Sequence, residues 1–297
     1  MIKLHPALRR GGWRVWELAA LVALPALAIA VTWGAWTDIV RIARQDEEAS
    51  HIILVPIVAA WLFWVRRRRL RLVRRRGLLT GTLLIALGWA MSYYGYTHAM
   101  QAAWHLGAVL MVVGAILSVL GVDVLLRFLP VFAVLVFLVP VPGSLRLQIA
   151  GPLQTATAEA TRVVLELAGL PITRSGNLLT INGVEVRVAE ACNGMRMVFA
   201  LLLVSYAFAF GTPLRTYVRV LIVAISPITA ILANVVRMVP TASLFGYADV
   251  DVARFFHDHI AGWAMLVLAL LALFGLVRLM RWALLPVTRY PLAYEYC

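Results

Sequence analysis

The side chains of this chain that could carry out chemistry are a cysteine, an arginine and two histidines in three separate segments. Cys192 precedes an apolar run, which would put its thiol at the N-terminus of a helix. The positive end of the helix dipole favours the thiolate, and Arg196, one helical turn later, would stabilise it further. Because the thiolate is the nucleophile of cysteine enzymes, Cys192 is the candidate nucleophile. The alternative is an ordinary small buried cysteine.

Arg237 stands at the end of a later apolar run, with Asn234 three residues before it and therefore on the same face of a helix. An arginine at the edge of the hydrocarbon region is costly and usually has a partner or a task. The alternative is an anchor whose guanidinium extends to the lipid headgroups. Asn234 would orient that guanidinium or bind an amide of a substrate.

His257 and His259 flank Asp258 just before the last apolar run. Histidine is the natural acid–base residue near neutral pH, although a polar cap at the membrane interface is the alternative for either one. Two histidines around an aspartate also resemble part of a metal site. Because no third ligand is evident in the sequence, we expect no metal.

Nucleophilic acyl transfer needs an activated thiolate, a proton shuttle, and a cation or donor for the developing oxyanion. Cys192, the two histidines and Arg237 would fill these roles if the chain brings them to one face of the molecule at a similar depth. The spacing alone does not establish this, so the elements that position the residues decide the matter.

Those elements are expected to be membrane helices. Of 297 residues, 63% are hydrophobic and only 14% are charged, whereas a soluble protein has about 25% charged residues. A helix needs about 20 apolar residues to cross the hydrocarbon core. The sequence predicts an all-α integral membrane protein that forms one polytopic domain over residues 1–297. About eight spans are expected, at residues 15–36, 51–65, 78–94, 102–120, 124–139, 195–210, 216–236 and 260–280. The first run exceeds the usual signal-peptide core of about 7 to 15 residues, so we expect it to be an uncleaved span.

The basic residues predict the orientation of these spans. Eight arginines fall between Arg66 and Arg76, and such a cluster between apolar runs indicates a cytoplasmic loop. With both termini in the cytoplasm, most basic residues lie inside, and the Cys192, Arg237 and histidine segments all lie outside. The net charge of +13 would also suit nucleic-acid binding, but its clustering indicates topology instead, and we expect no nucleic-acid partner.

The longest interval between spans, residues 140–191, is expected outside the cell membrane. Its first half, 145–167, alternates apolar and polar residues as an amphipathic interfacial helix does. Its second half, 172–188, has two alternating runs around Asn182-Gly183, which predicts a β-hairpin. No convincing internal repeat is visible, so the inverted repeats of many transporters find no support here.

At these residues the sequence resembles the exosortase/archaeosortase family of membrane transpeptidases. The resemblance covers about residues 50 to 275. Cys192-Asn193-Gly194 resembles the family's Cys-(Ser/Ala)-Gly motif, and Asn234-Val-Val-Arg237 resembles its Asn-x-x-Arg motif. The His257/His259 region before Gly262-Trp263 resembles the family's histidine before a Gly-Trp-like span. Residues 50–56 resemble an early family segment at the second span. Asn193 replaces the family's small residue. Asp258 stands where the family histidine is expected, so either His257 or His259 remains possible, with a preference for His257.

The resemblance implies a cysteine peptidase or transpeptidase with its active site outside the cytoplasmic membrane. Its partners would be membrane-anchored proteins with a C-terminal sorting signal, made of a recognition motif, an apolar span and a basic cluster. Cys192 would form a thioester, a histidine would transfer protons, and Arg237 would stabilise the oxyanion or thiolate, supported by Arg196, Asn193 and Asn234. No cofactor is expected. The alternatives are a transporter or polysaccharide-export component, and a membrane acyltransferase with a lipid donor.

Overall fold

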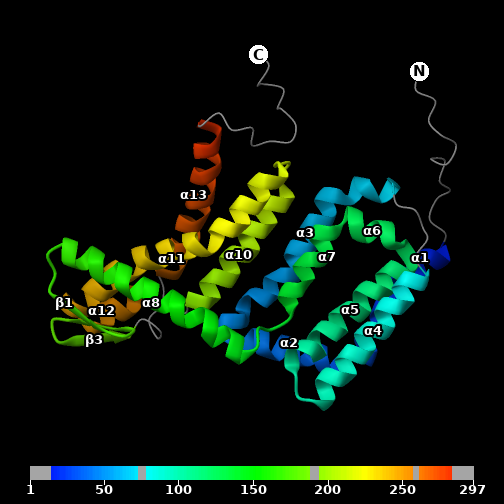
Figure 1. Ribbon diagram of the computed structural model, residues 1–297, viewed down its shortest axis with the longest axis horizontal. Helices are drawn as coiled ribbons and strands as arrows, with labels where there is room; N and C mark the ends of the chain where they lie inside the picture. The colour runs from blue at the N-terminus through cyan, green and yellow to red at the C-terminus, as the bar shows by residue number, and fades with distance from the viewer. Residues whose placement is uncertain (1–14, 73–77, 188–193, 257–260, 283–297) are drawn as a thin grey trace. The chain divides into compact units, whose positions relative to one another are not determined.

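The computed structural model describes residues 15–72, 78–187, 194–256 and 261–282. These residues form helices joined by short connections, together with one small β-sheet (Figure 1). The chain divides into two compact units, Met1–Pro142 and Gly143–Cys297, which are described in turn. The prediction of one polytopic domain stays a prediction.

The first unit consists of helices alone over its described residues. In chain order they are α1 (Val15–Val31), α2 (Trp33–Gln45), the 3₁₀ helix η2 (Glu47–Leu54), α3 (Val55–Arg66), η3 (Arg67–Leu72), α4 (Leu78–Thr97), α5 (Gln101–Leu120), α6 (Val122–Arg127), α7 (Leu129–Ala133) and η4 (Val134–Leu138). The predicted spans 78–94 and 102–120 coincide with α4 and α5 to within three residues, because each is one uninterrupted apolar run.

Helices α4 and α5 pack closely along an antiparallel contact, where they lie side by side in Figure 1. Gly81, Gly88 and Gly95 recur every seventh residue on α4 and are all buried. A Cβ on Gly88 would lie 2.8 Å from the carbonyl oxygen of Gly107, and one on Gly107 would lie 2.4 Å from the backbone nitrogen of Ser92. Small residues let membrane helices approach this closely, and van der Waals contact then holds them together.

The first predicted span, 15–36, differs from the structure. Helices α1 and α2 are bent by 79° at their junction instead of forming one straight helix. At this junction the hydroxyl of Thr32 donates to the carbonyl oxygen of Ala28 at 2.7 Å and accepts from the indole N–H of Trp36 at 3.1 Å. A threonine hydroxyl that bonds to the preceding turn bends helices. Beyond the bend, α2 continues to Gln45 and covers residues that were expected in a loop.

The fifth predicted span, 124–139, is also not one helix. The chain forms the short helices α6, α7 and η4, with a break at Phe128. Pro130 lies in the first turn of α7, where a missing N–H does not matter, whereas a longer helix through this position would lose a hydrogen bond.

The second unit holds the sheet and the long helices. Its elements are α8 (Gly143–Leu167), β1 (Ile172–Ser175), β2 (Leu178–Ile181), β3 (Val184–Arg187), α10 (Gly194–Gly211), α11 (Thr216–Tyr247), α12 (Val250–Phe255) and α13 (Ala261–Trp282). The predicted amphipathic helix 145–167 is present as α8. The sheet lies beside α8 and the C-terminal part of α11 (Figure 1).

The sheet has three antiparallel strands in the order β1-β2-β3. The predicted turn at Asn182-Gly183 is confirmed, and both residues have positive φ, 51° and 79°, as the tight hairpin turn requires. The hairpin predicted over 172–188 is present as β2 and β3. The sequence did not indicate the third strand, which arises because a second tight turn at Gly176-Asn177 divides the first run into β1 and β2. Gly176 has φ +62°, which glycine adopts without steric cost.

One face of the sheet is packed on α8 and α11. This apolar cluster is formed by Ala158, Leu165, Ile172, Leu179, Ile181, Val186, Met238 and Ala242. Leu179 and Ile181 are completely buried, and Ile181 approaches Gly246 so closely that a Cβ there would lie 2.5 Å from its Cγ2. The Nδ2 group of Asn182 also donates to the carbonyl oxygen of Gly246 at 3.1 Å. The sheet is therefore attached to the C-terminal end of α11 by apolar and polar contacts.

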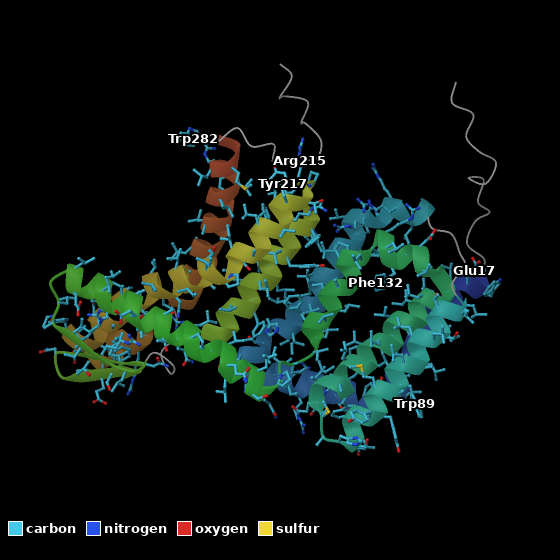
Figure 2. All side chains as sticks on the ribbon, in the orientation of Figure 1. Glu17, Trp89, Phe132, Arg215, Tyr217 and Trp282 are labelled. Carbon is cyan, nitrogen blue, oxygen red and sulfur yellow. The ribbon has the colours of Figure 1, made fainter. Side chains whose placement is uncertain are left out.

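Four helical segments are long and apolar enough to cross a membrane among the described residues: Glu48–Leu70, Leu78–Thr97, Gln101–Leu120 and Thr216–Tyr247. Two bent pairs, α1 with α2 and Leu129–Leu138 with α8, would raise the number to six. The chain is thus a multi-pass helical membrane protein with a small sheet, and eight spans stay a prediction. In the second unit, Arg215 and Tyr217 at the start of α11 and Trp282 at the end of α13 lie away from the sheet (Figure 2).

Candidate active site

Four of the predicted site residues, Cys192, Asn193, His257 and His259, lie outside the residues that the structure describes. The elements around them are described. Helix α10 begins at Gly194, directly after Cys192-Asn193, and its first turn includes Arg196. The two histidines fall between the end of α12 at Phe255 and the start of α13 at Ala261. All these segments belong to the second unit.

Asn234 and Arg237 lie on α11, one turn apart, and both side chains are buried. Asn234 is 5% exposed and Arg237 is 9% exposed. An arginine that anchored the helix to lipid headgroups would extend its guanidinium outward, whereas this one lies within the protein. Its burial favours a task inside the protein over an anchoring role, because an arginine taken out of water needs compensating interactions.

The polar partner of Asn234 comes from α8. Its Nδ2 group donates a hydrogen bond of 3.4 Å to the hydroxyl of Thr157, which is 2% exposed. The Oδ1 atom of Asn234 is buried too and accepts no hydrogen bond from any residue within the described ranges. A buried amide oxygen of this kind retains its capacity to accept an N–H or O–H group.

A small cavity lies beside this amide. It leaves about 10 Å³ for the centre of a water molecule, which is about the space that one water needs. Gln154, Thr157 and Asn234 supply its polar wall, and the remaining lining is apolar and comes from α8, α10 and α11: Ala150, Leu153, Val198, Ala230 and Ile231. The cavity therefore joins the helix that follows Cys192 to the helix that carries Arg237.

The length of α11 predicts a membrane depth for these two residues. Its 32 residues correspond to about 48 Å, whereas the hydrocarbon core is about 30 Å thick. A span that begins near Thr216 ends after about 20 residues, close to Asn234 and Arg237. The rest of α11 continues beyond it and packs on the sheet.

A charged cluster joins α8 to β1 on the exterior of the second unit. Arg162 bonds to both Glu159 and Glu166, and Arg174 on β1 bonds to Glu159. These residues border an open groove of about 630 Å³. The cluster fixes the sheet to α8 and is charge-balanced, so it does not itself select a charged ligand.

Two features of the structure were not anticipated from the sequence. One is Thr157, whose contact with Asn234 joins residues far apart in the chain. The other is a buried pair in the first unit, where Nε2 of His105 lies 3.1 Å from Oδ2 of Asp38. His105 is fully buried and Asp38 is 6% exposed, and Arg41 bonds to the same carboxylate. Nothing in the sequence signalled either contact, because each depends on how two helices pack.

Comparison with known proteins places these observations in a family. No significant match to the chain was found among curated proteins or among solved structures. The family model described as transmembrane exosortase matches residues 36–275. This range includes Cys192, Asn234, Arg237 and both histidines, and it covers well over half of the chain. The chain is therefore a member of the exosortase family of membrane proteins.

Proposed function

We propose that this protein is a membrane cysteine transpeptidase or protease that acts on C-terminal sorting signals of surface proteins. It cleaves near the outer membrane boundary and transfers the new carboxyl end to an acceptor in the cell envelope. The observation that carries this proposal is the burial of Arg237 with Asn234 on α11. A buried guanidinium at membrane-boundary depth, in a member of the exosortase family, fits a centre that stabilises developing negative charge.

The proposed chemistry assigns one role to each candidate residue. The thiolate of Cys192 attacks the scissile carbonyl, the C–N bond breaks, and His257 or His259 gives its proton to the leaving amine. The acceptor nucleophile then attacks the thioester, its proton passes to the same histidine, and the thiolate leaves. Arg237 stabilises the oxyanion or the thiolate in both steps.

Three further residues support these roles. Arg196 lies in the first turn of α10, where its charge and the helix dipole both favour a thiolate at Cys192. Asn193 follows the nucleophile directly. Asn234 offers its buried Oδ1 atom as a hydrogen-bond acceptor for the substrate.

The burial of Arg237 strengthens its proposed effect. A charge near a reacting carbonyl acts more strongly where water is excluded than at an open surface, because the effective dielectric constant is lower. The side chain of Arg237 is mostly shielded by protein, and the hydroxyl of Thr241 bonds to its backbone carbonyl at 2.8 Å one turn later.

One observation favours a transporter or polysaccharide-export component as the second candidate. Asp38 and His105 form a buried ionisable pair between α2 and α5, and such residues within membrane segments mark ion or substrate pathways. This candidate predicts that Asp38→Asn abolishes substrate flux in vesicles while Cys192→Ala leaves it unchanged.

The main proposal is tested by expressing Cys192→Ala beside a tagged substrate that carries a recognition motif, an apolar span and a basic tail. Cys297→Ser is the matched control, because it removes the chain's other cysteine. We expect the control to process the substrate normally and Cys192→Ala to leave it full-length. Normal processing by Cys192→Ala would exclude the cysteine mechanism.

A further inference from the structure

The contact between Thr157 and Asn234 connects α8 to the helix that carries Arg237. Both side chains are at least nine-tenths buried, and the hydrogen bond runs from Nδ2 of Asn234 to Oγ1 of Thr157 at 3.4 Å. In such surroundings a polar group without a partner is costly, so the bond to Thr157 restrains the orientation of the Asn234 side chain.

In the structure this contact leaves the oxygen end of the Asn234 amide available to a ligand. A carboxamide has an N–H₂ end that donates and an oxygen that accepts, and rotation by about 180° exchanges them. With Nδ2 bonded to Thr157, Oδ1 is left as a buried acceptor that no described residue uses. Thr157, Gln154 and Asn234 line the same small cavity.

The packing of α8 on α11 also holds the part of α11 that carries Arg237. On the C-terminal side of the Thr157–Asn234 contact in both helices, Ala158 and Leu165 of α8 belong to one apolar cluster with Met238 and Ala242 of α11. Arg237 stands between the polar contact and this cluster on α11. The hydroxyl of Thr157 and the apolar cluster therefore fix α11 on both sides of Arg237.

We propose that Thr157 is a positioning residue that keeps Oδ1 of Asn234 directed to accept a backbone N–H group of the bound polypeptide substrate. This inference rests on the proposed transpeptidase function and adds a residue and a substrate contact to it. A backbone N–H group of the bound segment satisfies the amide oxygen. Thr157 does not touch the reacting atoms.

The test uses the full-length protein in detergent or proteoliposomes with the tagged sorting-signal substrate, and it measures kcat and KM separately. Thr157→Val removes the hydroxyl and keeps a similar shape, whereas Thr157→Ser keeps the hydroxyl. Thr161→Val is the matched control, because Thr161 lies one turn further along α8, is completely buried, and its hydroxyl has no hydrogen-bond partner among the described residues.

We expect Thr157→Val to lower kcat/KM about fivefold to tenfold, as the loss of one orienting hydrogen bond does. Thr157→Ser and Thr161→Val should stay within about twofold of the unchanged protein. In an Asn234→Ala background, Thr157→Val should cause no further loss, because the residue through which it acts is gone. A purely structural role would lower activity in both backgrounds.

Three results would overturn the inference while leaving the proposed function intact. These are unchanged kinetics in Thr157→Val, equal losses in Thr157→Val and Thr161→Val, and a loss that persists without Asn234. Failure of the proposed function looks different. In that case the unchanged protein processes nothing, or Cys192→Ala processes as well as it does, and the inference is then overturned with the function.

Discussion

The burial of Arg237 changes the interpretation of an arginine near the end of an apolar helix. From the sequence, an anchor at the lipid headgroups and a functional cation were both reasonable. The structure buries the side chain within the second unit at 9% exposure, one helical turn from Asn234. Burial at this depth gives the residue an electrostatic influence that a headgroup anchor lacks.

A substitution that keeps the charge of Arg237 tests whether catalysis needs the planar guanidinium group. We expect Arg237→Lys to lower kcat about 100-fold, because lysine cannot reproduce the donor geometry for an oxyanion. The measurement is substrate processing at saturating substrate. Arg254→Lys is the control, because Arg254 is an exposed arginine of the same unit, and it should process normally. Equal activity of Arg237→Lys and the unchanged protein would argue for a non-catalytic role.

The candidate residues on α11 could be predicted from the sequence, but their contacts could not. Asn234 and Arg237 were identified from their spacing and from their place at the end of an apolar run. The partner of Asn234 was not, because Thr157 is one of several hydroxyl residues on α8 and only the packing of α8 on α11 selects it. The same holds for Asp38 and His105, which meet through the packing of α2 and α5.

Among the secondary-structure elements, long apolar runs predicted the helices reliably and short polar signals predicted the turns. Helices α4, α5 and α8 begin and end close to their predicted residues. The errors lie where a side chain interrupts a run. Thr32 bends the first span, Pro130 falls at the start of a new helix, and Gly176 adds a turn. Each interruption depends on a single residue, which the average hydrophobicity of the run does not reveal.

The glycine contact between α4 and α5 predicts a sensitive position. Gly107→Ala places a methyl group 2.4 Å from the backbone nitrogen of Ser92, so the helices must separate. We expect a loss of about 1 to 3 kcal/mol in the free energy of unfolding, as overpacking of a close contact causes. The measurement is the midpoint of unfolding of the detergent-solubilised protein.

Gly275→Ala on α13 is the matched control for this prediction. A Cβ at Gly275 meets nothing within 4 Å, and alanine is the better helix former by about 1 kcal/mol. We expect this variant to unfold at the same midpoint or later. If Gly107→Ala behaved in the same way, the close approach of α4 and α5 would be contradicted.

For the whole molecule, the composition predicted the class of protein and the family match agrees with it. A multi-pass helical protein follows from 63% hydrophobic and 14% charged residues, because such a chain cannot cover a large surface with polar groups. The number of spans was less predictable. The run 124–139 looks like one straight span in the sequence, whereas the structure divides it into short helices, and Leu129–Leu138 counts as a candidate span only as part of a bent pair with α8.

The predicted orientation can be measured by labelling single cysteines in intact cells. In a background with Cys192→Ala and Cys297→Ser, we introduce Glu185→Cys on the sheet or Arg68→Cys in the arginine cluster. An impermeant thiol reagent should label Glu185→Cys, because the sheet is expected outside, and should leave Arg68→Cys unlabelled until the cells are opened. Labelling with the reverse pattern would place the sheet and the end of α11 in the cytoplasm.

If Cys192 forms a covalent thioester with the substrate, mass spectrometry of a trapped intermediate detects it. Full-length protein and substrate are mixed without an acceptor, quenched in acid and digested. We predict an adduct of the substrate's new carboxyl end on the peptide that contains Cys192, removed by hydroxylamine and unchanged in Cys297→Ser. Cleaved substrate with no adduct on Cys192, or with the adduct elsewhere, would exclude Cys192 as the nucleophile.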